Sequence, residues 1–163
     1  MSYLPRVTLA TREEVSREFD DLGPDACMDE IGRGLEQSNP ELLDIAVKAA
    51  SDLGSERIRQ GFFMLYRALE REASLQADAS DLNALPKVSP PVRDDLVLEI
   101  DSIGEKAFMA SSVDELEQSN PELLQMAQFF AESHSDYLRA MQGFCLIYRA
   151  LAAQRERDRI MSH

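Results

Sequence analysis

The stretch LEQSNPELL occurs twice in the chain, at residues 35–43 and 116–124, with all nine residues identical. Extending this match at the same offset of 81 residues aligns residues 4–43 with 85–124, with 18 identities in 40 positions. One residue is then inserted in the second copy, and the match resumes as GFFMLYRAL at 61–69 over GFCLIYRAL at 143–151. A repeat of this length predicts an internal duplication into two modules of about 80 residues, 1–81 and 82–163.

The residue pattern within each module predicts helices throughout. Apolar residues recur at helical spacing after the repeated motif, and again in the block that contains Phe62 and Tyr66. Gly23 and Pro24 interrupt the first helical pattern, and Gly54 ends the third. We therefore expect an all-α protein with three or four helices in each module. Because a duplicated module often takes the place of a second subunit, we expect one helical bundle with a pseudo-twofold axis.

Three shorter segments give more local predictions. LPRVTL at 4–9 and LPKVSP at 85–90 open the two copies, and we expect extended arms there because Pro90 and Pro91 would interrupt a strand. Thr11 and Glu14 have the spacing of a capping box and predict the start of the first helix. The polar stretch ASLQADASDLNA at 73–84 predicts the connection between the modules.

The repeated motif has the composition of a helix start. In one scheme Asn39 caps the helix with Pro40 at its first position, and in the other Ser38 caps it and Glu41 reaches back. Both schemes explain SNPELL as a structural device, but neither explains the two polar residues before it. We therefore consider those residues and their copies as candidate binding residues. They are Glu36, Gln37, Glu117 and Gln118.

The second repeated block, GFxxxYRAL, contains an arginine beside an apolar stripe. Its glycine, at 61 or 143, is expected to let a neighbouring helix approach closely. Its arginine lies at the edge of the buried face and has two interpretations. It either forms an ion pair with a repeated acid, for which Glu18, Asp20 and Glu36 are candidates, or faces a ligand. In the second case the binding residues are Tyr66, Arg67, Tyr148 and Arg149.

The charge of the chain limits its partners. The net charge is −13, and both halves are acidic, at −8 for residues 1–81 and −5 for 82–163. Binding to nucleic acid or to an anionic membrane needs clustered lysine and arginine, so we expect neither. A protein partner fits this charge, and a basic one fits it best. The sequence shows no signal peptide, no membrane-spanning stretch and no CxxC pair, which predicts a cytoplasmic protein.

The repeat also tests the candidate chemistry. Cys27 aligns with Phe108 and Cys145 with Phe63, which indicates packing positions rather than reactive thiols. His134 has no histidine counterpart, and no metal-binding or phosphate-binding motif is present. We therefore expect no catalytic residue, metal or cofactor.

These observations favour a non-enzymatic protein-interaction protein, an adaptor or regulatory subunit. One alternative is a small-molecule-binding or catalytic protein that uses the cleft between the modules. Another is an acidic decoy that competes with nucleic acid for a basic protein, which would require carboxylates aligned along one face.

Overall fold

The computed structural model describes residues 4–76 and 85–161, and its described residues form eight α-helices and no strand. The helices are α1 (Leu9–Leu22), α2 (Pro24–Ser38), α3 (Pro40–Leu53), α4 (Glu56–Gln76), α5 (Pro90–Ile103), α6 (Glu105–Ser119), α7 (Pro121–Ala131) and α8 (Tyr137–Met161). The predicted all-α class is confirmed. Residues 4–8 and 85–89 lie outside the helices, as expected for extended arms.

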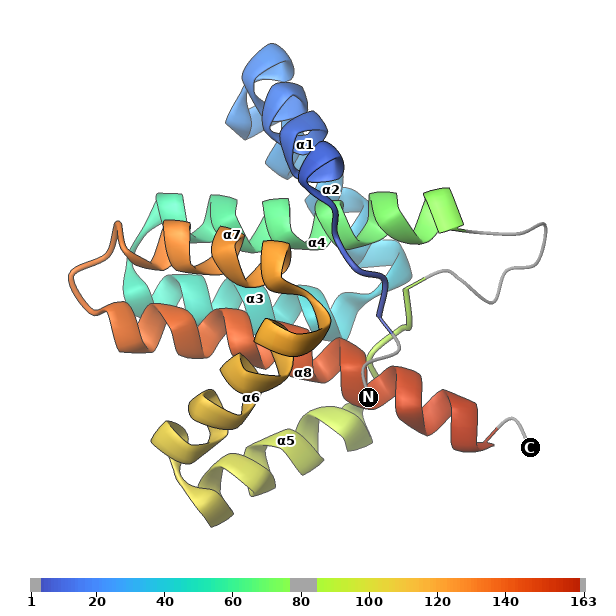
Figure 1. Ribbon diagram of the computed structural model, residues 1–163, viewed down its shortest axis with the longest axis vertical. Coiled ribbons are helices and arrows are strands. Elements are labelled where there is room, and N and C mark those ends of the chain that lie inside the picture. Colours follow the sequence, from blue (N-terminus) through green and yellow to red (C-terminus); the bar gives the residue numbers. More distant parts are fainter. Residues whose placement is uncertain (1–3, 77–84, 162–163) are drawn as a thin grey trace.

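Four of the helices make up the centre of the molecule. Helices α3, α4, α7 and α8 lie together, while the α1–α2 pair and the α5–α6 pair project on opposite sides (Figure 1). The principal contacts between the two halves of the chain join α3 to α8, α4 to α7, and α4 to α8. The buried hydrophobic residues of both halves form one connected cluster.

The helix contacts follow the same scheme in both halves. In the first half α1 packs on α2 and α4, and α3 packs on α2 and α4. In the second half α5 packs on α6 and α8, and α7 packs on α6 and α8. The helix bounds also correspond, because α5 and α6 begin 81 residues after α1 and α2.

Two glycines sit where the helices of the two halves meet. A Cβ atom on Gly61 would lie 2.7 Å from Cγ of Phe130, and one on Gly143 would lie 2.8 Å from Cζ of Phe62. The rings of Phe62 and Phe144 meet edge to face there, with centroids 4.7 Å apart. The close approach predicted for these glycines is therefore confirmed, and a side chain at either position would force the neighbouring phenyl rings to move.

The predicted helix ends are right where glycine decides them. Gly23, with a φ of 89°, ends α1 and allows α2 to begin at once, and Gly54 ends α3. The prediction for the start of α1 is wrong. Its cap is Thr8, whose Oγ1 accepts a hydrogen bond from the backbone N–H of Thr11 at 3.2 Å.

The buried carboxylate of Glu72 explains the earlier start of α1. Its oxygens accept hydrogen bonds at 2.8 Å from the backbone N–H of Thr8 and from the hydroxyl of Thr11.

Helix α4, to which Glu72 belongs, continues to Gln76, so residues 73–76 are helical and not part of a connection. The rest of the predicted connection, 77–84, lies outside the described residues.

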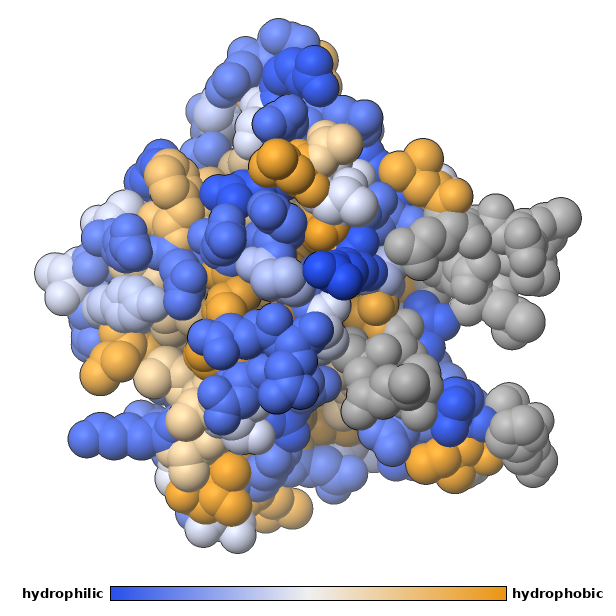
Figure 2. All heavy atoms as spheres, viewed as in Figure 1, coloured by the Kyte–Doolittle hydropathy of each residue, from blue (hydrophilic) through white to orange (hydrophobic). Residues whose placement is uncertain are grey.

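The surface of the molecule is mainly polar. Hydrophilic residues cover most of the face in Figure 2, and the apolar residues on it are scattered. Within residues 4–76 and 85–161, no helix combines the length and the apolar character needed to cross a membrane.

Candidate functional site

The repeated motif binds the extended arm of the other half of the chain. Asn39 is buried at the start of α3, and its Nδ2 donates a hydrogen bond to the carbonyl oxygen of Pro86 at 2.8 Å. Its Oδ1 accepts one from the backbone N–H of Val88, also at 2.8 Å. The side-chain amide therefore satisfies one donor and one acceptor of a buried arm that pairs with no strand in the described part of the chain.

Asn120, in the second copy of the motif, binds the first arm in the same way. Its Nδ2 donates to the carbonyl oxygen of Pro5 at 2.9 Å, and its Oδ1 accepts from the backbone N–H of Val7 at 2.9 Å. Each half of the chain therefore holds the arm of the other half, and both bonds of each asparagine join residues more than 45 positions apart.

The first predicted capping scheme is right about the positions of Asn39 and Pro40 but wrong about the hydrogen bond, and the scheme with Ser38 as the cap is wrong. Asn39 stands at the N-cap position and Pro40 follows it as expected, but the Asn39 side chain makes no capping hydrogen bond. The hydroxyl of Ser38 donates to the carbonyl oxygen of Gly34 at 2.8 Å, which is a bond within α2. The buried arm offers the asparagine two partners at once, whereas a cap offers it one, and the arm prevails.

Glu41 also contacts the other half of the chain. Its carboxylate lies 3.0 Å from Nη1 of Arg93 on α5, and Asp44 lies 2.6 Å from the same nitrogen. The hydrogen bond from Arg93 lowers the pKa of Asp44 below its ordinary value. In the second copy, Glu122 likewise lies 3.2 Å from Arg12 on α1.

The candidate binding residues before the motif lie at the ends of α2 and α6. Their side chains are exposed, and none of them forms a hydrogen bond or an ion pair with another described residue. Among the described residues, neither Arg67 nor Arg149 forms an ion pair with any of them. These four residues are Glu36, Gln37, Glu117 and Gln118.

Arg149 forms an ion pair inside the second half. Its Nη2 lies 3.0 and 2.9 Å from the two carboxylate oxygens of Glu99 on α5. The guanidinium carbon lies 5.1 Å from the centre of the Phe108 ring. Its side chain is only 18% exposed, so this cation contacts the protein more than solvent.

Arg67, its counterpart, forms looser ion pairs. Its Nη1 lies 2.7 Å from Glu70 on the same helix, and its Nε lies 3.7 Å from Glu18, the residue that corresponds to Glu99. The expected pairing with Glu18 is therefore present. The alternative partners Asp20 and Glu36 are not among the ion pairs of the described residues.

The repeated tyrosines are buried within their own halves. Burial raises the pKa of Tyr66 to about 12, and its hydroxyl lies beside Ser38 at the end of α2. The hydroxyl of Tyr148 lies 3.3 Å from Glu115 and 3.4 Å from Ser119 on α6. Both tyrosines thus tie the last helix of a half to its second helix.

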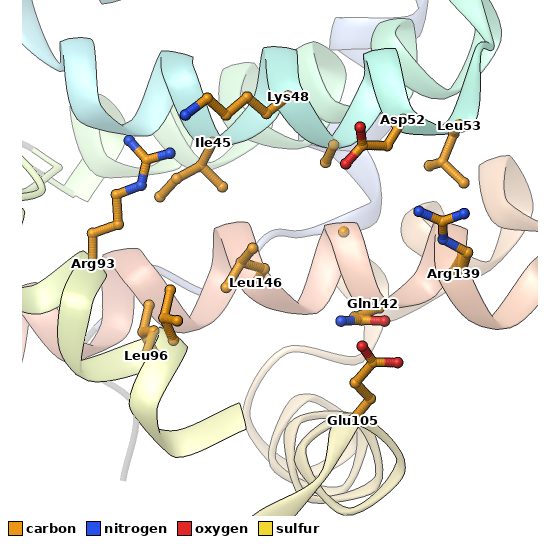
Figure 3. Close-up of a pocket in the computed structure, with 13 residues that line it drawn as sticks. Ile45, Lys48, Asp52, Leu53, Arg93, Leu96, Glu105, Arg139, Gln142 and Leu146 are labelled. Carbon is orange, nitrogen blue, oxygen red and sulfur yellow. The ribbon is translucent and has the colours of Figure 1, made fainter. Parts of the chain in front are cut away.

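A groove lies between the two halves at another place. One wall is α3, and the other is formed by α5, α8 and the start of α6 (Figure 3). Its volume is about 370 Å³. The apolar lining comes mainly from Ile45, Ala49, Leu53, Leu96 and Leu146. The charged and amide side chains around it belong to Lys48, Asp52, Arg93, Glu105, Arg139 and Gln142.

The charged side chains of the groove differ in how firmly they are held. Asp44 fixes Arg93 and also lies 3.3 Å from Lys48, so both cations at one end share a carboxylate. At the other end Arg139 is exposed on α8 and faces Asp52 across the groove (Figure 3). Among the described residues, the Arg139 guanidinium takes part in no ion pair. Arg139 is therefore available to an incoming group.

None of the four residues predicted to line a cleft between the modules lines this groove. Tyr66, Arg67, Tyr148 and Arg149 face α1, α2, α5 and α6 within the halves. Identical positions in the repeat do not predict the residues that do line it, because most of the lining residues differ between the two copies. The available signal lay at positions where the copies differ, such as Lys48 against Phe129.

The two cysteines are buried, and the ring of His134 is hydrogen-bonded to the backbone. Cys27 and Cys145 are buried, and burial raises the pKa of Cys145 to about 12, so its thiolate does not form near neutral pH. Nε2 of His134 lies 3.0 Å from the carbonyl oxygen of Leu53. Nδ1 of the same ring accepts a hydrogen bond from the backbone N–H of Asp136. In the described part of the chain, no three histidine, cysteine or carboxylate side chains gather where a metal ion could bind.

The chain matches no known protein family, no curated protein and no solved structure. Its groove, walled by both halves and accessible from solvent, is the feature best suited to bind another molecule.

Proposed function

We propose that the protein is a non-enzymatic interaction protein, an adaptor or regulatory subunit, that holds a segment of a partner protein in the groove between α3 and α5–α8. The observation that carries this proposal is the lining of the groove. Its floor is apolar and buried, as at Ile45 and Leu96, and exposed charged side chains such as Lys48 and Arg139 stand around it. A floor of this kind takes up apolar side chains of a bound segment, and a charged edge sets its orientation.

We infer further that residues 1–81 and 82–163 are two copies of one module, related by a pseudo-twofold axis. The 18 identities in residues 4–43, the corresponding helix contacts and the reciprocal binding of the arms support this duplication. A duplicated module can specialise, because one copy keeps the fold while the other changes. The groove lies where the copies have changed.

The charge of the chain supports a protein partner rather than a nucleic acid. With a net charge of −13, the chain repels phosphate backbones and attracts basic segments. Asp52 and Glu105 at the groove can receive basic residues that flank the apolar part of such a segment. A cytoplasmic location belongs to the same proposal.

A small molecule is the second candidate for the groove. A volume of about 370 Å³ falls within the range of ligand sites, and polar groups converge on an apolar floor. This alternative keeps the cleft between the modules as the site but replaces the four repeated tyrosines and arginines with the lining described above.

Selection from a random peptide library displayed on phage tests the proposal. The full chain is the bait, and each selected peptide is measured against the Ala49→Phe variant, in which a phenyl ring fills the groove. We expect peptides whose Kd rises at least about tenfold on this variant, which corresponds to about 1.4 kcal/mol. Ala10→Phe, a substitution at an exposed position of α1, should leave binding unchanged.

The melting temperatures of both variants show whether they fold. Peptides that bind Ala49→Phe as tightly as the original chain would contradict the proposal. A selection that yields no peptide dependent on Ala49 would also contradict it and would favour the small molecule.

A further inference from the structure

The groove between the halves opens beside α3 at positions where the second copy of the sequence has two phenylalanines. The residues aligned with Lys48 and Ala49 of α3 are Phe129 and Phe130 of α7. Cγ and Cβ of Phe130 would lie 2.7 and 2.8 Å from a Cβ atom on Gly61. Phe130 therefore lies directly against the backbone of α4 at the glycine that the repeat preserves.

An arginine covers both of these rings. The guanidinium carbon of Arg57 lies 5.4 Å from the centre of the Phe129 ring and 5.2 Å from that of Phe130. At such distances a cation is attracted to the electron-rich face of an aromatic ring. Glycine, two phenyl rings and arginine thus form one packed unit between α4 and α7.

The open groove contains the same unit without its rings. Gly143 and Arg139 align with Gly61 and Arg57, and both line the groove. A Cβ atom on Gly143 would lie 2.8 Å from Cζ of Phe62, just as one on Gly61 would lie 2.8 Å from Cζ of Phe144. Its other neighbour is Cβ of Ala49 at 3.5 Å, so a methyl group stands where Phe130 stands in the other half. Arg139 forms no ion pair among the described residues and has no aromatic ring aligned beneath it.

The space left by the missing rings is accessible from outside. Lys48 and Arg139 are exposed, and Val97, which also lines the groove, is 51% exposed. If Ala49 in place of a phenylalanine were only a difference in packing, the surrounding helices would be expected to close over it, as cores do when they relax around a lost side chain. Here α3 and α5 stay apart, with Arg93 and Asp44 bridging them at one end.

We propose that the groove binds an aromatic side chain of a partner protein, with its ring over Ala49 and Gly143 and its face against the Arg139 guanidinium. This inference rests on the proposed function and names the chemistry of the partner. Charge complementarity selects an aromatic over an aliphatic anchor, because only an aromatic ring offers a negative face to the arginine. The partner thereby supplies what Phe129 and Phe130 supply in the other half.

A pair of small compounds tests this inference. N-acetyl-phenylalanine amide carries a phenyl ring, and N-acetyl-cyclohexylalanine amide has nearly the same size without the aromatic face. Each is titrated to millimolar concentrations into the ¹⁵N-labelled full chain while amide chemical shifts are recorded. We expect saturable shifts around Leu53, Leu96 and Leu146, and a Kd about two- to fivefold lower for the phenyl compound.

Three variants locate the effect. Ala49→Phe should abolish the shifts from both compounds. Arg139→Met should remove the preference for phenyl over cyclohexyl, and because Arg139 is exposed this variant is expected to fold. Arg57→Met, the matched substitution in the other half, should keep both binding and preference.

The possible results separate this inference from the proposed function. Equal affinity for the two compounds, unchanged in Arg139→Met, overturns the aromatic anchor but leaves a groove that binds apolar groups. Absence of shifts at the groove overturns the anchor as well, and selected peptides that depend on Ala49 but lack aromatic residues would then preserve the proposed function. If neither compounds nor peptides depend on Ala49, both fail.

Discussion

Asn39 and its copy Asn120 have two roles that only partly appear in the sequence. The SNP pattern correctly places Asn39 before the first turn of α3 and Pro40 within it. Its hydrogen-bonding partners, Pro86 and Val88, come from the other half of the chain. A local sequence motif predicts only contacts between residues close together in the chain, so these hydrogen bonds could not be predicted from it.

Asn39→Asp separates the two roles of this residue. Aspartate caps a helix as well as asparagine does, so a capping role predicts no loss of stability. Binding of the arm predicts a loss of about 2–4 kcal/mol, because aspartate cannot donate to the buried carbonyl of Pro86 and leaves it unsatisfied. Urea unfolding measures this difference.

Two further variants serve as controls for this experiment. Asn120→Asp should lose a similar amount of stability, since Asn120 makes the equivalent bonds to Pro5 and Val7. Gln37→Ala, at an exposed position whose side chain makes no hydrogen bond with the other described residues, should change the free energy of unfolding by less than about 0.5 kcal/mol. An Asn39→Asp variant as stable as the original chain would show that the arm contributes little.

At the scale of the element, periodicity and glycine predicted most of the helices. Apolar spacing identified α3, α4 and α8, and Gly23 and Gly54 fixed two of the ends. The start of α1 was misplaced because Glu72, 64 residues further along the chain, binds the amide of Thr8. The end of α4 was misplaced because ASLQ reads as polar but continues a helix whose earlier turns are packed in the core.

Substitution of Arg149 and of Arg67 tests whether the repeated arginine stabilises the fold of each half. Arg149→Met removes the pair with Glu99 that joins α8 to α5. We expect the free energy of unfolding to fall by roughly 1–3 kcal/mol, because hydrogen bonds between charged, partly buried groups contribute that much. Arg67→Met should cost less, because its pair with Glu18 on α1 is longer, at 3.7 Å, and its closest partner, Glu70, is a more exposed residue of the same helix.

Arg139→Met is the matched control on α8, because it removes an exposed arginine that has no ion pair with the described residues. It should change stability by less than about 0.5 kcal/mol. Chemical denaturation compares the three variants. If Arg149→Met and Arg67→Met are as stable as Arg139→Met, the repeated arginines do not stabilise the fold. Their interpretation as ligand-facing residues would then be favoured.

At the scale of the whole molecule, the groove depends on how the two halves are placed. Its walls come from residues 45–53, 93–105 and 139–146, which the sequence alone does not bring together. The identical residues of the repeat predicted helices at the same places in both halves. The hydrogen bonds from Asn39 and Asn120 to the arms show how each half holds the other. The candidate site lies at differences such as Ala49 against Phe130, which become informative only when both surroundings are known.

The central claim is that the two halves form one body, because a groove shared by both requires them to stay in place. Native-state hydrogen exchange at increasing urea concentration tests this claim most directly. We predict that the slowest amides of α3 and α4 and those of α7 and α8 exchange with one opening free energy and one dependence on urea. Residues 4–76 and 85–161 that open at two separate free energies, each with a smaller dependence on urea, would contradict it.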